Sequence, residues 1–323
     1  MTDLGTAPPH AGHHAHGEGF VVYEWQAFEH YLAMKLLPAA TFLHAAIDDS
    51  ALAVLARMPR ECRAFLFQVN LSCTARFPPE RGALVEALAA RGIRILNGSL
   101  TDVRKTALRR LLRAAGLPSL AAARNGDQDE TLMVKTDFNY GGFGERLLSP
   151  AERRVLGLSA DEIGLRDWSD YRVLPRRDMP DEWWLDASLV VERFVENPQG
   201  EFFRVYVAGD SVMVVKAYTA CAIKKVTGGQ RDENVLFSRR RLPNLGANDV
   251  LSDELLSTLH RFLARVDLDF GSLDVVHDGE RCFIVDLNLT PHGARGVLRP
   301  EVEAHLRQGM AASAPGSGWS AVA

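Results

Sequence analysis

Two acidic side chains and one amide near the end of the sequence have the types and spacing of a magnesium site. Asp286 and Asn288 lie two positions apart at the end of one apolar run, and Asp274 lies in the run before it. Residues two apart on a β-strand share one face. Carboxylate and amide oxygens suit Mg²⁺, which also takes water and substrate phosphate as ligands. The pattern predicts a metal site on paired strands, and strand-end acids pointing into solvent are the alternative.

The register of these two strands decides whether the acids meet. A two-residue turn at Asp278-Gly279 is a strong hairpin signal and pairs Asp274 with Phe283. That register leaves Asp274 and Asp286 on opposite faces of the sheet. A three-residue loop or a β-bulge brings them to the same face. The metal hypothesis therefore predicts an irregular hairpin.

A lysine followed by glycines forms a second candidate site. Lys135 ends a strand-like run, and Gly141, Gly142 and Gly144 follow it. Glycines let backbone N–H groups approach phosphate oxygens, and a lysine adds a mobile positive charge. The spacing matches neither the P-loop nor the dinucleotide fingerprint. The stretch is either a phosphate-binding loop or a plain turn.

Two further stretches have the character of nucleotide-binding strands. Residues 190–196 run from apolar residues into Glu-Arg-Phe-Val-Glu, which could seat a flat ring while backbone groups read its edge. Arg204 and Lys216 lie on successive strand-like runs and could project toward a phosphate. Solvated charges at strand ends are the alternative for both stretches.

The elements that must position these residues suggest an α/β region followed by strands. A strand at 64–70, a helix at 80–91 and a strand at 93–97 make a βαβ unit, whose crossover is nearly always right-handed. Asp49 or Ser50 is expected to cap a helix that ends at Met58, and Thr101 or Asp102 to cap the next one. Further along the chain we expect an irregular segment at 150–184, strands at 131–135, 188–194, 202–207, 211–218, 272–277 and 281–287, and a helix at 253–266.

Composition narrows the class of protein. The 323 residues carry a net charge of −4, so nonspecific nucleic-acid binding is a poor expectation. The sequence has no apolar run of the roughly 18 residues that a membrane span needs, and no secretory signal pattern. We therefore expect a cytoplasmic protein with neither a nucleic-acid nor a membrane partner.

Taken in order, the motifs resemble those of the ATP-grasp superfamily over residues 93–296. The matching parts are Lys105, Lys135 with its glycine loop, the Val190–Val195 hinge, Arg204-Val-Tyr-Val, and Asp274 with Asp286-x-Asn288-x-Thr-Pro291. The resemblance implies an α/β and α+β protein with an N-terminal α/β pre-ATP-grasp domain and two α+β subdomains that clasp ATP. The implied boundaries are a flexible His-rich tail at 1–19, the α/β domain at 20–100, the small subdomain at 101–195, the large subdomain with the metal site at 196–310, and a flexible tail at 311–323.

The resemblance also implies roles for individual residues. Lys105 and Lys135 would hold the α- and β-phosphates, and the Gly141–Gly144 loop would close over the phosphates. Glu192, Phe194 and Val195 would meet adenine, while either Glu196 or Glu201 would take the ribose hydroxyls. Asp274, Asp286 and Asn288 would bind one or two Mg²⁺, or Mn²⁺, and Arg204 would stabilise the transferring phosphoryl group.

Three departures from the superfamily pattern concern the same region. Asp286 stands where a glutamate is usual, and Ser272 stands where D-alanine–D-alanine ligases have an arginine. The role of that arginine would pass to Arg204, Lys216 or Arg295. The stretch after Asn288 also differs, so His292 or Arg295 is either a reader of a substrate carboxylate or a structural loop residue.

The implied reaction is ligation of a carboxylate to an amine through an acyl-phosphate, with release of ADP and phosphate. The partners would be a small-molecule or peptide carboxylate and an amine acceptor. The basic loop Ala222–Arg231 and the segment Asp167–Trp184 would shape their pocket, and a homodimer is one option for the first domain. A small-molecule kinase and a non-catalytic nucleotide-binding module are the alternatives.

Overall fold

The computed structural model describes residues 17–26, 31–158, 171–197, 199–219, 231–239, 250–292 and 298–312. Several expectations lie outside these residues: most of both tails, nearly all of the loop at 222–231, residues 167–170, and Arg295. Within the described part of the chain, no helix is both long and apolar enough to cross a membrane.

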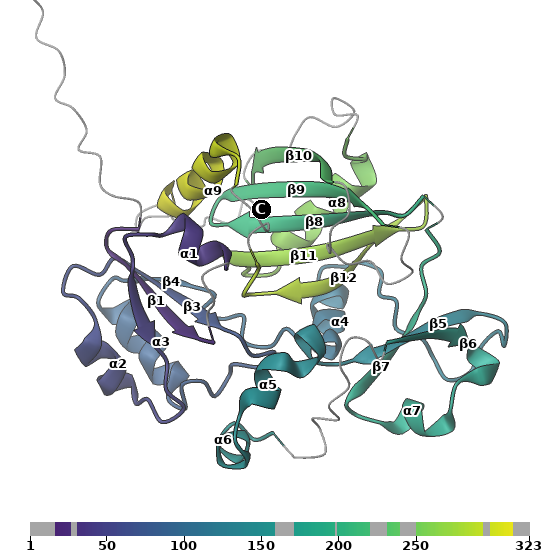
Figure 1. The fold of residues 1–323 in the computed structure, drawn as a ribbon, viewed down its shortest axis with the longest axis horizontal. Helices are drawn as coiled ribbons and strands as arrows, with labels where there is room; N and C mark the ends of the chain where they lie inside the picture. The colour runs from purple at the N-terminus through teal and green to yellow at the C-terminus, as the bar shows by residue number, and fades with distance from the viewer. Residues whose placement is uncertain are drawn as a thin grey trace, which may run out of the picture.

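A four-stranded parallel sheet with strand order β2-β1-β3-β4 forms the first unit (Figure 1). The polar side chain of Ser50 accepts a hydrogen bond from the N–H of Ala53 and so begins α2, as expected. The predicted βαβ unit is present as β3, α3 and β4. The elements are β1 (Phe20–Trp25), α1 (Leu32–Leu36), β2 (Thr41–His44), α2 (Ala51–Arg57), β3 (Ala64–Val69), α3 (Arg81–Ala90) and β4 (Arg94–Leu96).

A small antiparallel sheet with order β6-β5-β7 forms the second unit, with α7 beside it. Strand β5 is central, so Lys135 near its end lies between two paired neighbours. The elements from this part of the chain are α4 (Lys105–Ala114), β5 (Thr131–Thr136), η1 (Asn139–Gly142), α5 (Phe143–Leu147), α6 (Pro150–Val155), β6 (Arg172–Pro175), η3 (Arg176–Asp178), α7 (Asp181–Leu185) and β7 (Leu189–Arg193).

A five-stranded antiparallel sheet with order β10-β9-β8-β11-β12 forms the third unit. Helices α4 and α8 pack on one face, in an apolar cluster with Val205 and Leu273. Helices α1 and α9 pack on the other face, in a cluster with Tyr206 and Phe270 that extends to the first sheet (Figure 1). The elements are β8 (Glu201–Ala208), β9 (Ser211–Tyr218), β10 (Arg231–Ser238), α8 (Asp253–Leu263), β11 (Phe270–His277), β12 (Cys282–Asn288) and α9 (Pro300–Ala312).

This architecture confirms the predicted fold class, α/β followed by α+β. Helix α4 differs from expectation, because it begins at Lys105 after Arg104, and neither Thr101 nor Asp102 caps it. The carboxylate of Asp102 is instead held by Arg104 and Arg110. The segment expected to be irregular contains α6, β6 and α7, whose short lengths leave little periodic signal in the sequence.

Asn97 joins the first sheet to the third. It is fully buried and has a left-handed φ of 58°. Its side-chain amide donates to the carbonyl of Phe270 at 2.8 Å and accepts from the N–H groups of Asp269 and Phe270 at 3.2 and 3.1 Å. One side chain therefore satisfies three backbone groups at the start of β11.

Replacing Asn97 should loosen this junction. We expect Asn97→Ala to lower the free energy of unfolding by roughly 2–4 kcal/mol, because buried backbone groups lose their partners. Asn97→Gly is the matched control: it loses the same bonds but adopts the left-handed backbone freely, so it should be about 1 kcal/mol more stable than the alanine variant. Urea unfolding measures both differences. An alanine variant within 0.5 kcal/mol of wild type would contradict this account.

Candidate functional site

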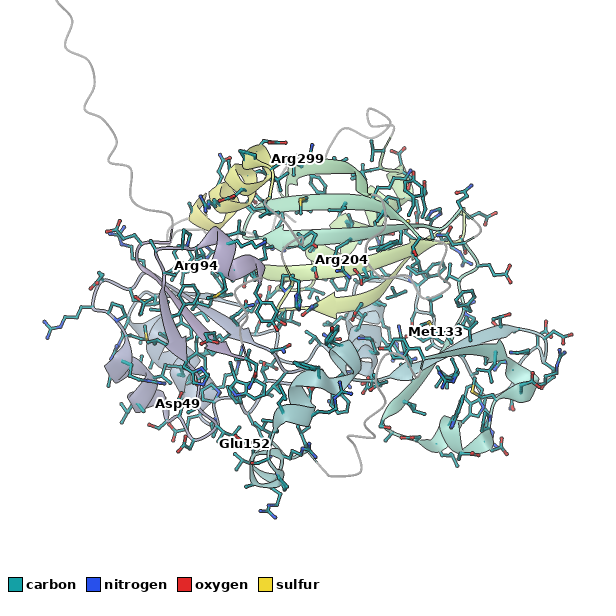
Figure 2. All side chains as sticks on the ribbon, viewed as in Figure 1. Asp49, Arg94, Met133, Glu152, Arg204 and Arg299 are labelled. Carbon is teal, nitrogen blue, oxygen red and sulfur yellow. The ribbon has the colours of Figure 1, made fainter. Side chains whose placement is uncertain are left out.

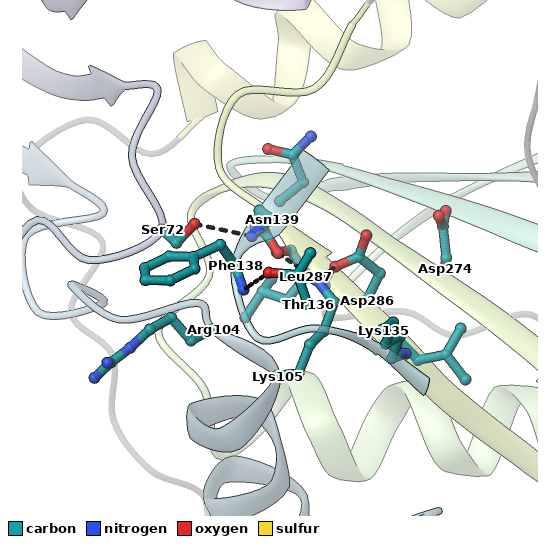
Figure 3. Close-up of polar contacts among 12 residues, drawn as sticks. Ser72, Arg104, Lys105, Lys135, Thr136, Phe138, Asn139, Asp274, Asp286 and Leu287 are labelled. Atoms are coloured by element: carbon teal, nitrogen blue, oxygen red, sulfur yellow. Dashed lines mark hydrogen bonds and ion pairs between the residues drawn. The ribbon is translucent and has the colours of Figure 1, made fainter. Parts of the chain in front are cut away.

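A β-bulge in the β11–β12 hairpin brings the two predicted metal acids opposite each other. Val275 pairs with Ile284, but Asp274 pairs with Asp286, so Val285 is the extra residue. The predicted two-residue turn is wrong, because His277 pairs with Cys282 and four residues form the loop. The predicted irregularity is nevertheless present, and Figure 3 shows both carboxylates pointing the same way.

Arg204 lies beside this pair on the neighbouring strand. It is the register partner of Asp274 across β8 and β11, and Figure 2 shows it within the five-stranded sheet. Its Nε and Nη2 atoms donate to the two carboxylate oxygens of Asp274, each at 2.7 Å. Partial burial works against the charged guanidinium, but Asp274 outweighs it and raises the pKa of Arg204. The arginine is therefore a fixed positive charge at the site.

Lys105 reaches Asp286 from the first turn of α4. Its Nζ lies 2.6 Å from Asp286 Oδ1 and 2.6 Å from Asn139 Oδ1. The lysine side chain is only 4% exposed. Burial opposes its charge, yet the pairing with Asp286 raises the pKa of Lys105 and holds the pKa of Asp286 below its ordinary value. Both groups are ionised at neutral pH.

Lys135 and Glu192 form a second buried ion pair at the edge of the site. Lys135 Nζ lies 2.6 Å from a carboxylate oxygen of Glu192 and donates to the carbonyl of Val285, the bulge residue, at 3.2 Å. Arg109 of α4 contacts the other carboxylate oxygen of Glu192 at 3.4 Å. Burial tends to neutralise Glu192, but Lys135 and Arg109 keep its pKa lowered. The small sheet, α4 and β12 thus meet through charged side chains.

The segment after β5 is held against two other parts of the chain. Its Asn139 N–H donates to Ser72 Oγ at 2.9 Å, and Asn139 Nδ2 donates to the carbonyl of Leu287 at 2.6 Å (Figure 3). Tyr140, Gly141 and Gly142 then adopt left-handed backbone angles, with φ of 49°, 66° and 70°. Glycine tolerates these angles, and the tyrosine among them is strained.

Gly144 has a different reason for being glycine. A Cβ built on it would lie 1.8 Å from the carbonyl oxygen of Asn70, directly after β3. No side chain fits in that space. Gly144 therefore permits close contact between this segment and the first unit, whether or not it also helps to surround a phosphate.

Lys216 and Glu201 lie apart from these residues. Lys216 pairs with Phe203, whose side chain faces α4 and α8, whereas Arg204 lies on the opposite face. Glu201 accepts from Lys216 at 2.5 Å and contacts His277 at 2.9 Å. The hydrogen bond with Glu201 raises the pKa of Lys216. Lys216 is therefore not placed beside Arg204.

The remaining hinge residues follow β7. Phe194 and Val195 are half-buried, Glu196 is exposed, and the Phe194 N–H donates to the carbonyl of Thr131 at 3.0 Å. Their predicted contacts with adenine and ribose stay predictions.

The donors around the hairpin suit a hard divalent cation. Asp274 and Asp286 share a face, and Asn288 lies opposite Ser272, two residues further along the same strand. Among the described residues no three acidic, histidine or cysteine side chains form a metal-binding group by themselves. Two carboxylates, an amide oxygen and substrate phosphate oxygens are a set that Mg²⁺ accepts.

Four residues in or beside the site escaped the sequence analysis: Ser72, Arg109, Asn139 and Glu145. Ser72 and Arg109 lie in stretches where polar residues are common, so neither gave a signal. Asn139 and Glu145 do flank the singled-out glycines, and their positions inside that motif were the available signal.

Solved structures similar to this chain include two ligases and a macrocyclase. No family model and no curated protein matches the sequence. The ATP-grasp ligase PsnB, solved with a precursor variant, Mg and ADP, is 14% identical, with 91% of this chain and 97% of that chain covered and a TM-score of 0.46. D-alanine–D-alanine ligase from Bacillus anthracis is 11% identical (90% and 94% covered, TM-score 0.45), and the macrocyclase MdnB from Microcystis aeruginosa is 13% identical (90% and 98% covered, TM-score 0.47). Because these likenesses are distant, the function has to be inferred from the side chains of this chain.

The Lys135–Glu192 pair gives a prediction for stability. We expect Glu192→Gln to destabilise the protein by about 3–5 kcal/mol at neutral pH, because Lys135 loses its carboxylate partner in a buried position. The pKa of Glu192 is lowered in the folded state, so this stabilisation is present above the ordinary value of 4.5 and is lost as the pH falls through the folded value. The difference in unfolding free energy between wild type and Glu192→Gln should therefore shrink as the pH falls from 7. Denaturant unfolding over this pH range measures it.

The double variant Lys135→Met/Glu192→Gln is the control for this pair. It removes both charges together, so it should be more stable than Glu192→Gln alone. Strictly additive losses would show that the two groups do not depend on each other.

Proposed function

We propose that this protein is an ATP-grasp ligase that joins a carboxylate to an amine through an acyl-phosphate, using ATP and Mg²⁺. One observation carries the proposal: Lys105, Lys135 and Arg204 come from three different elements and converge on the bulged hairpin that bears Asp274 and Asp286. The cations suit a chain of phosphates, and the facing carboxylates suit the metal that accompanies it.

The ion pairs in the site support a metal–nucleotide complex as the ligand. An anion alone would attract Lys105 but leave Asp286 without its cation, and a metal alone would do the reverse. A metal–phosphate complex offers Lys105 an anion and Asp286 a cation in the same event. Exchange of partners then keeps every buried charge compensated, which is the condition for binding charged groups at low energetic cost.

The proposed roles follow from position. Lys105 and Lys135 hold the α- and β-phosphates, with residues 141–144 beside them, and Arg204 stabilises the charge on the transferring phosphoryl group. Asp274, Asp286 and Asn288 hold Mg²⁺, which neutralises phosphate charge when bound. Glu192 is expected at adenine, and it also orients Lys135 through the 2.6 Å contact. Phe194 and Val195 stay the proposed adenine contacts, and Glu196 or Glu201 the ribose contact.

The chemistry proceeds by positioning and charge stabilisation. A carboxylate oxygen of the substrate attacks the γ-phosphorus, the bond to the bridging oxygen breaks, and ADP leaves with the electron pair. Arg204 and the two lysines stabilise charge on the oxygens that surround this transfer. An amine then attacks the acyl carbon and displaces phosphate.

Acyl-phosphate formation gives a direct test. With Mg-ATP, pooled carboxylates and hydroxylamine, the wild type should form hydroxamates and phosphate. Asp274→Asn and Asp286→Asn should each lower hydroxamate formation by about 100-fold or more, because metal-binding charge is lost. ADP formation without hydroxamate would support the kinase alternative, and bound ATP without turnover would support the binding module.

Metal affinity gives a second test that does not require turnover. In the wild type, Mn²⁺ should bind weakly without nucleotide, because Lys105 already holds Asp286. Lys105→Met frees that carboxylate, so Mn²⁺ alone should bind about tenfold or more tightly than in wild type. Electron paramagnetic resonance of free Mn²⁺ measures this. Equal affinity in the two proteins would show that the ion pair does not control the metal site.

A further inference from the structure

A polar cavity lies between the first unit, the segment after β5 and the end of β12. It has room for about one water molecule, and the polar residues in its wall are Asn70, Ser72, Asn139, Glu145, Asn288 and Thr290. Asn139 contacts Lys105, and Asn288 follows Asp286 on the metal-site face, so the cavity adjoins the proposed phosphate site.

Glu145 is the charged residue in the cavity wall. Glu145 is only 2% exposed. One carboxylate oxygen accepts a hydrogen bond from the Ser72 N–H at 2.6 Å. Burial raises the pKa of Glu145, although its hydrogen bonds and the nearby charge of Lys105 act in the opposite direction. A carboxylate whose pKa is raised by burial accepts a proton more readily than a solvent-exposed one.

The topology of the first sheet points to the same place. Strands β1 and β3 are neighbours, and the chain continues from β1 toward β2 on one side and from β3 toward β4 on the other. Such a reversal opens a crevice at the carboxyl ends of the two strands, where open α/β sheets bind ligands. Asn70 and Ser72 follow β3 directly and line the cavity.

We infer that this cavity binds the ammonium group of the acceptor amine and that Glu145 takes its proton. The inference rests on the proposed ligase function and names a catalytic residue for its second step. The lining side chains present carboxylate, amide and hydroxyl oxygens, and an ammonium group offers three N–H donors. A group about the size of one water molecule fits inside, which matches an ammonium group.

The proposed step converts an ammonium group and an acyl-phosphate into an amide and phosphate. Glu145 accepts one proton, and the freed electron pair of nitrogen attacks the acyl carbon. The carbon–oxygen bond to phosphate breaks, and phosphate departs with the electron pair of that bond. A second proton passes from nitrogen to the departing phosphate, which leaves one N–H in the amide of a primary amine acceptor.

The test uses two nucleophiles that differ in protonation. Hydroxylamine is largely unprotonated at neutral pH and needs no base, whereas ammonium must lose a proton. Glu145→Gln keeps an oxygen that can accept from Ser72. We expect this variant to form hydroxamate at nearly the wild-type rate but to form primary amide from ammonium about 100-fold more slowly, with recovery as the pH rises. Equal loss with both nucleophiles would show a structural role only.

Competition adds a second criterion. In the wild type, ammonium chloride should suppress hydroxamate formation, because ammonium occupies the cavity, and it should not do so in Glu145→Gln. Glu80→Gln is the matched control, since Glu80 also accepts from a backbone N–H, that of Ala51, and neither residue lines the cavity. It should behave as wild type in both assays. Wild-type hydroxamate formation that ammonium leaves unchanged would overturn the subsite while the ligase function stands.

A binding measurement separates failure of the subsite from failure of the proposed function. At matched chloride concentration, ammonium should raise the thermal midpoint of the wild type more than tetramethylammonium, which is too large for the cavity. The difference should vanish in Glu145→Gln. If the wild type forms no hydroxamate but this difference appears, the cavity binds ammonium and the ligase function fails. If the difference is absent, the inference is wrong.

Discussion

The β-bulge at Val285 is the constraint on which the site depends. A regular hairpin would alternate Asp274 and Asp286 to opposite faces, so the two carboxylates would not lie side by side. The extra residue returns both carboxylates to one face and leaves its own carbonyl free to accept from Lys135. A single backbone irregularity thereby creates a pair of acids and links it to the small sheet.

Charge pairing then joins the units of the molecule. Lys105 connects α4 to β12, Lys135 and Glu192 connect the small sheet to both, and Arg204 fixes Asp274. Buried or half-buried pairs of this kind add little stability compared with apolar packing, but loss of one partner is costly. The apolar clusters around α4, α8, α1 and α9 supply most of the stability, and the charges set which ligand the site can accept.

Much of this arrangement was readable in the sequence. Asp274, Asp286 and Asn288 lie in strongly apolar strands, so strand alternation predicted that a shared site needs an irregular hairpin, through either a three-residue loop or a bulge. Lys105 was singled out by resemblance and Arg204 by its charge on a strand-like run, and the structure places both beside the two acids, while their proposed roles stay predictions. Partners across the chain were not readable: nothing local connects Glu192 to Lys135, or Ser72 to Glu145. The face that Lys216 occupies was not readable either: alternation along β9 places it on the side of the sheet opposite Arg204, and its predicted phosphate contact stays a prediction.

Gly144 limits which part of the molecule can move when the site opens. The segment after β5 is fixed to the first unit at two points, by the Ser72 contact at Asn139 and by the close approach of Gly144 to the Asn70 carbonyl. A segment anchored at both ends cannot move over the site as a flap does. Opening of the site for a bulky ligand would therefore swing the small sheet about its connections and leave residues 139–144 in place, with the cavity beside Glu145 keeping its shape throughout.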